Sequence, residues 1–322
     1  MGGEPQPGGV DGLRRPHGAL LLLLVLSALI FLLLYLAPGD LARNLIGLRN
    51  VTPETIAAVR AQYRLDDPLW LQYLGWMGDA LRGDLGTSAR NQAPVAQLLA
   101  SRAGVTLALA LLGFGIAVTV AVPLGIVCAR RAGGTLDRLI TTGSVIGISA
   151  PSFAVALLLL ATFSLALGWF PLYGIGDGGL DTLHHLVLPA VTVALGLGAI
   201  VVKLTRTAVV RELARDYVVA ARARGFGERA VLRLALRNAV VPIVTGAGLV
   251  LTFLVGGTVF VETVFALPGW GTLLQDAVLF KDVAVVQALT LAIAALIVVI
   301  ALLVDLACLA LDPRLRPTRR TA

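Results

Sequence analysis

The chain has 322 residues, of which 57% are hydrophobic and 14% are charged, whereas soluble domains average about 45–50% apolar and about 25% charged residues. This composition excludes a disordered protein and a protein that coats nucleic acid, so no nucleic-acid partner is expected despite the net charge of +7. The two cysteines, Cys128 and Cys308, form no CxxC pair, so neither a disulfide framework nor a thiolate metal site is indicated. We expect an all-α integral membrane protein.

Six apolar segments predict transmembrane helices, because a hydrocarbon core about 30 Å thick takes about 20 helical residues to cross. The first segment follows Arg14 and Arg15 in the manner of a signal sequence. It is longer than a secretory core of about 7–15 residues, so we expect an uncleaved span. The six segments are 19–36, 103–127, 139–167, 186–202, 240–265 and 283–311.

Most of the 26 basic residues lie in the N-terminal tail, in the connections after the second and fourth segments, and in the C-terminal tail. By the positive-inside rule these four places are cytoplasmic. The prediction is a multi-pass membrane protein with both termini in the cytoplasm. Its expected parts are a tail and first helix at 1–36, an extracytoplasmic loop at 37–102, a five-helix core at 103–311 and a second tail at 312–322.

The extracytoplasmic loop carries signals for two short helices. Thr52, Pro53 and Glu54 are typical of an N-cap, a first helical position and an acidic first turn, and a second helix is expected after Pro68. The apolar stripe of the second helix packs at the membrane interface or on the bundle in one interpretation, and docks an external partner in the other. The apolar positions are Ile56, Val59 and Tyr63 in the first helix and Trp70, Tyr73, Leu74, Met77 and Leu81 in the second.

The connection at 204–239 is the longest one on the cytoplasmic side. Its alanines favour a short helix that begins near Asp216, where the helix dipole favours an acid, and Gly225 suits the left-handed position that ends a helix. The thin helix could enter a groove on another protein, and its arginines could pair with acidic side chains or lipid headgroups. A second helix from Glu228 is expected to end at Pro242. A basic loop of this kind can also be only a topology signal.

The segment 216–242 resembles the signature cytoplasmic loop of type I ABC-importer permeases. That consensus has Glu-Ala-Ala, then Gly four residues on, and later Asn-Ala and Pro. The matching residues here are Val219, Ala220, Ala221, Gly225, Asn238, Ala239 and Pro242. The first position departs from the consensus, since Val219 stands in place of Glu.

Further stretches narrow the resemblance to the peptide/nickel permease family, and to the member of each pair with the long first outer loop. Leu234, where His is frequent, and Cys308, where Tyr is frequent, depart from the family pattern and weaken any transfer of fine specificity. The matching stretches are 38–40, 65–68, 83–88, 123–125, 149–153, 188–190, 216–217, 235–238, 262–265, 268–269 and 312–314.

The resemblance implies a permease fold with six transmembrane helices that forms half of a translocation path in the bacterial cytoplasmic (inner) membrane. The implied partners are a second homologous permease in a heterodimer, one or two cytoplasmic ABC ATPases, an extracytoplasmic solute-binding protein and membrane lipid. The chain has no GxxxxGK[ST] motif, so ATP and Mg²⁺ are expected in the ATPases and no cofactor or catalysis in this chain. The implied cargo is a dipeptide or oligopeptide, with nickel or another small chelate as the alternative.

The resemblance also assigns site residues. The coupling helix, which would sit in a groove of the ATPase, contains Arg215, Asp216, Tyr217, Ala220, Ala221, Arg224 and Gly225. Candidates for the translocation path are Glu262, Ser149 and Ser152. Because charge in hydrocarbon is costly, Glu262 either faces the path or caps a span end, and the two serines alternatively mark a kinked helix at Pro151. The role of Asp305 is open.

No catalytic or metal-binding constellation emerges from the sequence. His184 and His185 are adjacent, so they point to different faces of a helix, and spacing places no third ligand. The rival function is an ion-coupled secondary transporter, which the lack of a two-fold repeat and the few ionisable residues in the spans disfavour. A purely structural subunit is the third alternative.

Overall fold

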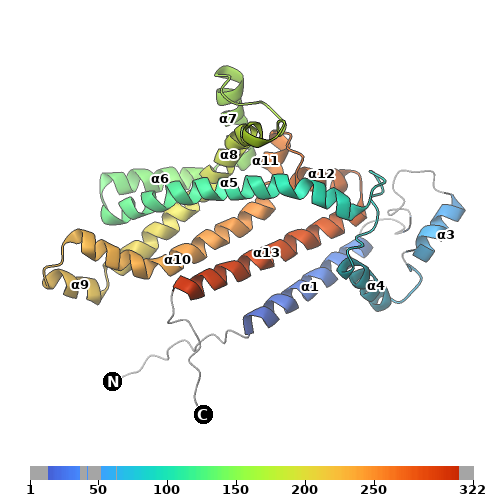
Figure 1. Ribbon diagram of the computed structural model, residues 1–322, viewed down its shortest axis with the longest axis horizontal. Coiled ribbons are helices and arrows are strands. Elements are labelled where there is room, and N and C mark those ends of the chain that lie inside the picture. The colour runs from blue at the N-terminus through green and yellow to red at the C-terminus, as the bar shows by residue number, and fades with distance from the viewer. Residues whose placement is uncertain (1–13, 37–41, 43–51, 63, 312–322) are drawn as a thin grey trace, which may run out of the picture.

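The computed structural model describes residues 14–36, 42, 52–62 and 64–311 (Figure 1). The C-terminal tail 312–322, the stretches 38–40 and 312–314, and Tyr63 lie outside the described residues. The described part of the chain is helical, with an isolated β-bridge between Thr87 and Pro94. The predicted all-α class is therefore confirmed.

The described part of the chain forms a succession of helical elements. They are α1 (Arg14–Leu36), α3 (Pro53–Gln62), α4 (Leu69–Leu81), α5 (Val95–Arg130), α6 (Thr135–Ser149), α7 (Ser152–Leu159), η1 (Leu160–Ala166), α8 (Gly179–Leu213), α9 (Asp216–Ala223), α10 (Glu228–Gly257), α11 (Val259–Val264), α12 (Trp270–Leu279) and α13 (Val283–Leu311).

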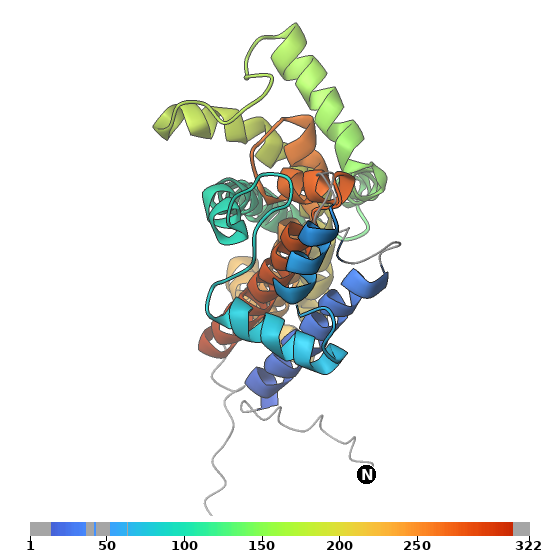
Figure 2. The same cartoon turned by 90° about the vertical axis from the view of Figure 1, so that its right-hand side faces the viewer.

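The long helices lie side by side, with α5 and α10 packed on α8, α13 on α10, and α1 on α13. The short helix α9 projects at one end of this bundle, and α3 and α4 lie at the opposite end (Figure 1). Figure 2 shows α7 reaching away from the bundle on the side opposite α1, whereas α6 packs on α8. The α9 end is called the cytoplasmic end below and the α3–α4 end the outer end, following the predicted topology.

In the described part of the chain, four helices are long and apolar enough to cross a membrane by length and composition: α5 with 36 residues, α8 with 35, α10 with 30 and α13 with 29. The bent pair of α6 with α7–η1 gives a fifth if it is one span, and the described apolar stretch of α1 is the shorter Leu20–Leu32. In α8, 56% of the apolar window is buried inside the described chain, against 17% in α13. Thus α8 is the central helix, and α13 keeps a broad apolar face for lipid or a protein neighbour.

The segment 139–167, which the sequence predicts to be one span, is divided in the structure into two helices that form a broken span or a re-entrant loop. Its two halves, α6 and α7–η1, meet at an angle of 103°. Ala150, at the break, is extended with ψ 126°, because the ring of Pro151 disfavours a helical conformation at the residue before it. The predicted kink beside Ser149 and Ser152 is thereby confirmed, and it is sharp enough to divide the helix.

The helix expected to end at Pro242 instead continues through it, and the expected span 240–265 is divided. α10 runs unbroken from Glu228 to Gly257, and α11 follows as a separate helix. A proline deprives the carbonyl four residues earlier of its helical donor, and that residue, Asn238, is exposed. Water at the cytoplasmic end can therefore satisfy the carbonyl, so the helix persists.

Close contact between α5 and α8 depends on small residues. A Cβ atom added to Gly125 in α5 would lie 2.7 Å from Cβ of Thr205 and 2.8 Å from the carbonyl oxygen of Val202 in α8, so only glycine fits there. Towards the cytoplasmic end, Arg206 of α8 donates two hydrogen bonds to Asp137 of α6, at 2.5 and 2.7 Å. This bidentate pair is the strong, geometrically specific form of an arginine–carboxylate contact, and it holds α6 on α8.

Candidate functional site

The predicted short helix on the cytoplasmic side is confirmed as α9. Arg215 before it is extended, with φ −76° and ψ 151°. The helix ends in the expected way at Gly225, whose φ of +81° is left-handed, while the backbone N–H of Phe226 donates to the carbonyl of Ala221 at 3.2 Å. Because L-residues with a Cβ rarely adopt that conformation, glycine at 225 sets where the helix stops.

One face of α9 packs on its own chain. Val218 and Ala221 are buried against Val231 of α10, with Leu213 and Tyr217 beside them. Ala221, which the sequence placed among the candidate docking residues, therefore faces α10. A larger side chain at this position would disturb the packing inside the subunit.

Polar contacts fix α9 at both ends. Tyr217 donates a hydrogen bond to Glu212 at 2.7 Å, and burial raises the pKa of the Tyr217 phenol. After the helix, Arg222 donates to Glu228 at 2.9 and 3.2 Å, and this hydrogen-bonded partner raises the pKa of Arg222. Sequence reasoning missed the pair of Arg222 and Glu228, although opposite charges on both sides of a Gly-containing turn are a visible signal.

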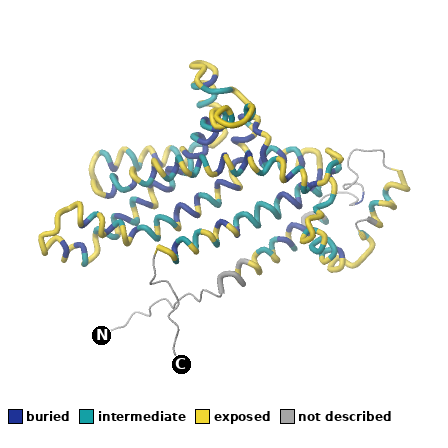
Figure 3. The backbone as a smooth tube through the Cα atoms, viewed as in Figure 1, coloured by how far each residue is buried: buried dark blue, intermediate teal, exposed yellow. Residues whose placement is uncertain are grey.

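The opposite face of α9 is uncovered in the described chain (Figure 3). Among the predicted docking residues, Arg215, Asp216, Ala220, Arg224 and Gly225 are exposed, whereas Tyr217 is half-buried. Two large apolar side chains share this exposure, Val219 at 61% and Phe226 at 57%. Phe226 was not singled out from the sequence, and its position next to the helix-ending glycine is the signal that could have done so. Exposed apolar side chains beside arginines are typical of a surface that binds a partner.

Exposed arginines continue this surface along α10. Arg229, Arg233 and Arg237 are spaced by four residues and all are exposed, so they line one face of the helix. Such a row of guanidinium groups suits acidic side chains or lipid phosphates. The cytoplasmic end therefore offers an apolar centre beside a basic strip.

The residues predicted for the translocation path lie in two different environments. Ser149 and Ser152 are exposed at the break between α6 and α7, whereas Glu262 of α11 is fully buried. The α11 helix packs against α7, but the carboxylate of Glu262 is directed to α5 and α12. The path role predicted for these three residues stays a prediction.

Glu262 holds four hydrogen-bond donors. Its Oε1 accepts from the hydroxyls of Thr106 at 2.8 Å and Thr258 at 2.9 Å, and its Oε2 accepts from the backbone N–H groups of Gly271 at 2.7 Å and Thr272 at 3.2 Å. The two amides belong to the first turn of α12, where the helix dipole also favours an anion. A Cβ at Gly269 would lie 2.4 Å from Oε2, so this glycine makes room for the carboxylate.

The two adjacent histidines contact different partners, as predicted for neighbours on a helix. A ring nitrogen of His184 lies 2.9 Å from the carbonyl oxygen of Trp169, and a ring nitrogen of His185 lies 2.9 Å from that of Asp181. In the described part of the chain, no group of three or more His, Cys, Asp or Glu side chains could hold a metal ion.

Long apolar helices around α8, with a short exposed helix between two of them on one side, define the class of polytopic membrane proteins. Residues 121–317 match the family of binding-protein-dependent transport system inner membrane components, and residues 12–110 match the N-terminal region of such membrane components. The chain belongs to this family. It is an ABC transporter permease, a multi-pass inner-membrane subunit of a class that works with ATPase and binding-protein partners, and the resemblance read from the sequence is confirmed.

Several relatives match nearly the whole chain. A probable peptide ABC transporter permease protein of Sinorhizobium fredii is 38% identical over 312 residues, covering 96% of this chain and 99% of that protein. The glutathione transport system permease protein GsiC of Escherichia coli is 38% identical over 305 residues, covering 94% and 98%. A chain of the inward-facing MetNI methionine ABC transporter matches with a TM-score of 0.57 at 19% identity, covering 67% of this chain and 97% of that one, which shows a shared fold.

Proposed function

We propose that this chain is the permease subunit of an ATP-driven importer of dipeptides or oligopeptides, with α9 as the helix that couples it to the ATPase. The names of the relatives, which refer to peptides and glutathione, support a peptide-like cargo. The coupling role is carried by one observation: α9 is locked to its own chain on one face and exposes Val219 and Phe226 on the other.

The packing of α9 gives the coupling a mechanical route. Val218 and Ala221 contact Val231 in the first turns of α10, and the pair of Arg222 with Glu228 ties the two helices again. α10 is continuous over 30 residues, which at about 1.5 Å per residue is about 45 Å. A displacement of α9 by an ATPase would therefore move one stiff element that extends across the membrane and tilts between two states.

The same proposal includes the finer topology and assembly. Six spans are obtained when α1 and the bent pair α6–α7 each count as one, and both termini then lie in the cytoplasm. The chain would pair with a second, homologous permease as a heterodimer, because the apolar faces of α13 and α1 are left uncovered within the described residues. The solute-binding protein would approach the outer end.

The coupling proposal is tested with two substitutions of the same residue type at opposite ends. Val219→Arg in α9 and Val278→Arg in α12 replace valines of similar exposure, 61% and 59%. We expect Val219→Arg to lower co-purification of the ATPase about tenfold or more, the change that about 1.4 kcal/mol produces, while Val278→Arg retains it. Equal ATPase recovery from both variants would contradict the coupling role of α9.

The cargo is tested by uptake into proteoliposomes with the solute-binding protein and the ATPases. ATP-dependent uptake of labelled di- and tripeptides is the expected result. Uptake of nickel or another chelate without peptide uptake would assign the alternative cargo. Uptake by this chain alone, driven by an ion gradient without ATP, would replace the importer by a secondary transporter.

A further inference from the structure

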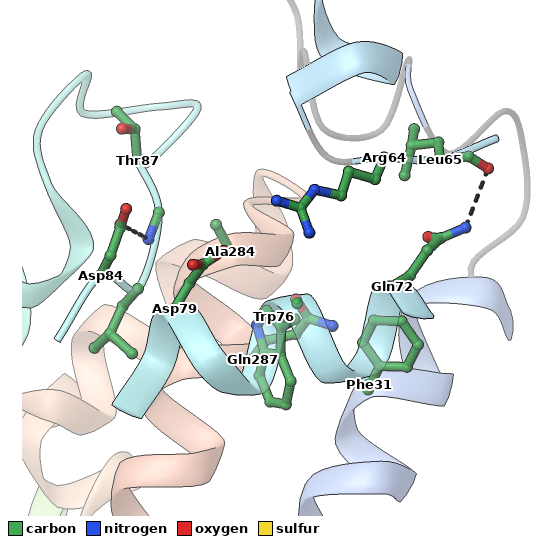
Figure 4. A pocket seen from close by; sticks show the side chains of 13 residues that line it. Phe31, Arg64, Leu65, Gln72, Trp76, Asp79, Asp84, Thr87, Ala284 and Gln287 are labelled. Carbon is green, nitrogen blue, oxygen red and sulfur yellow. Dashed lines mark hydrogen bonds between the residues drawn. The ribbon is translucent and has the colours of Figure 1, made fainter. Parts of the chain in front are cut away.

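The outer end holds a pocket that the coupling proposal does not use (Figure 4). Its volume is about 220 Å³, below the about 300–1,000 Å³ of sites for drug-sized ligands, so it suits a small solute or headgroup. Five parts of the chain meet there: the α1 helix, the turn after α3, the α4 helix, the loop 84–87 and the first turns of α13. Trp76 and Phe31 form an aromatic wall.

A guanidinium group is held over this pocket. Arg64 lies in the turn between α3 and α4 with φ +51°, and the buried Gln72 fixes that turn by donating to the carbonyls of Leu65 at 3.1 Å and Asp67 at 2.7 Å. Nη1 of Arg64 rests on Gly75, 3.2 Å from where a Cβ atom would be. Figure 4 shows the side chain reaching into the pocket. Among the described residues, no acidic side chain lies within ion-pair distance of it.

A second donor in the pocket lacks a partner. Gln287 of α13 lines the pocket and is 7% exposed, and its Nε2 atom is buried without a hydrogen bond in the described chain. A buried amide left in this state costs free energy, and native proteins rarely leave one without a reason. A ligand with an acceptor group in the pocket would satisfy it.

Two carboxylates stand on the other side. Asp79 of α4 and Asp84 of the loop both line the pocket, and in Figure 4 they lie beyond the tip of Arg64. Oδ1 of Asp79 forms an ion pair with Nη1 of Arg82 at 3.5 Å. Oδ1 of Asp84 accepts a hydrogen bond from the backbone N–H of Gly86 at 3.0 Å. Each carboxylate keeps an oxygen that can accept from a ligand.

From this arrangement we infer that the outer pocket binds a small zwitterion, with an oxyanion at Arg64 and Gln287 and an ammonium group at Asp79 and Asp84. Charge-assisted hydrogen bonds from a guanidinium favour a carboxylate or phosphate, and the carboxylates favour a protonated amine. Two sources carry both groups: a free amino acid or short peptide, and the headgroup of phosphatidylethanolamine. The inference does not depend on the peptide cargo or on the coupling role of α9.

The test uses the full-length chain, purified with the subunits that accompany it, in nanodiscs made only of phosphatidylglycerol, which has no ammonium group. Binding of dialanine is measured by calorimetry, with N-acetyl-dialanine and dialanine amide as probes that each lack one charge. Phosphatidylethanolamine retained from the native membrane is measured by native mass spectrometry. Binding of dialanine by the wild type would identify a free amino acid or short peptide as the source, and retained phosphatidylethanolamine would identify the lipid headgroup.

Three variants separate the pocket from general effects. Arg64→Gln and Gln287→Leu each remove a donor while keeping similar side-chain size, and Arg60→Gln removes an arginine of α3 that pairs with Asp66 instead. We expect Arg64→Gln and Gln287→Leu to weaken binding of the zwitterion that the wild type binds, dialanine or phosphatidylethanolamine, about tenfold or more. We expect Arg60→Gln to leave this binding unchanged. Gln287→Leu also distinguishes a binding donor from a merely unsatisfied one, because in the second case it would increase thermal stability without loss of binding.

The inference is overturned if the wild type binds neither dialanine nor phosphatidylethanolamine, or if all three variants bind as it does. It is also overturned if the acetylated and amidated probes bind as tightly as dialanine. ATP-dependent uptake measured in the same preparations keeps the proposals apart, since uptake by the wild type without zwitterion binding would reject only the pocket.

Discussion

The α9 helix at the cytoplasmic end and the outer end of the bundle are held in place by different kinds of contact. At the cytoplasmic end the polar bonds of α9 are local: Tyr217 bonds to Glu212 and Arg222 to Glu228, five and six residues apart. At the outer end they join distant parts of the chain. Ser88 bonds to Asp282 across 194 residues, and Thr106 bonds to Glu262 across 156.

This difference separates a region that the chain completes from one that it leaves open. The buried carboxylates of Glu262 and Asp282 bring the ends of α5, α12 and α13 to fixed positions without any other protein. The described side-chain bonds of α9 reach no farther than the hydrogen bond of Tyr217 with Asn238, 21 residues away, and the helix exposes Val219 and Phe226. Stability is therefore expected to depend on the outer end, and partner binding on the cytoplasmic end.

The strongest test of the comparison is Glu262→Ala. It leaves the buried backbone N–H of Gly271 and the buried hydroxyl of Thr258 without their acceptor, besides the half-buried N–H of Thr272. Each buried group costs about 1–3 kcal/mol, so we expect a loss of about 2–6 kcal/mol. Thermal unfolding of the purified chain in detergent measures it. The matched control is Glu54→Ala on α3. Because Glu54 is exposed, this substitution should leave the melting temperature unchanged. An equal melting temperature for wild type and Glu262→Ala would show that the hydrogen bonds of Glu262 do not stabilise the outer end.

A smaller loss is expected from Asp282→Asn. Asp282 is 2% exposed and accepts from the Ser88 hydroxyl at 2.5 Å and from the amides of Ala89 and Arg90 at 3.3 Å. An amide keeps one acceptor oxygen, so we expect about 1–3 kcal/mol of destabilisation. Faster proteolysis within the loop 82–94, compared with the wild type at equal temperature, is the direct measurement. Unchanged cleavage in that loop would argue against Asp282 as its anchor.

The comparison also explains how much the sequence could predict. Features set by neighbouring residues were predicted correctly: the helix at α9, its left-handed end at Gly225 and the kink at Pro151. Features set by distant residues were not, because spacing along the chain says nothing about which helices meet. The four donors around Glu262 and the pocket between Arg64 and Gln287 belong to this second kind. The prediction that the helix ends at Pro242 was wrong for a third reason. The continuation of α10 through Pro242 depends on solvent reaching one carbonyl, which the sequence does not show.

At the cytoplasmic end, Phe226→Ala is expected to leave the fold unchanged and to weaken partner binding. Phe226 is 57% exposed, and truncation of an exposed side chain away from special features changes stability by less than about 0.5 kcal/mol. If α9 is a docking helix, the same change should lower ATPase co-purification, as aromatic anchors do at interfaces. Val218→Ala is the opposite control: it removes a buried side chain and should lower the melting temperature. A melting temperature lowered as much by Phe226→Ala as by Val218→Ala would contradict the division between the two ends.

The smallest effect is expected for the ion pair of Arg222 with Glu228, although it is the clearest polar contact of α9. Its side chains are 45% and 72% exposed, and exposed ion pairs contribute little because water and salt screen them. Arg222→Gln should therefore leave the melting temperature nearly unchanged, and any difference from wild type should vanish in about 1 M salt, where charges are screened within about 3 Å. A double-mutant cycle with Glu228→Gln isolates the pair from other effects of each substitution. A coupling between the two residues that persists in high salt would mean that the pair, rather than the packing of Val218 on Val231, holds α9 to α10, and the cytoplasmic end would then resemble the outer end in how it is built.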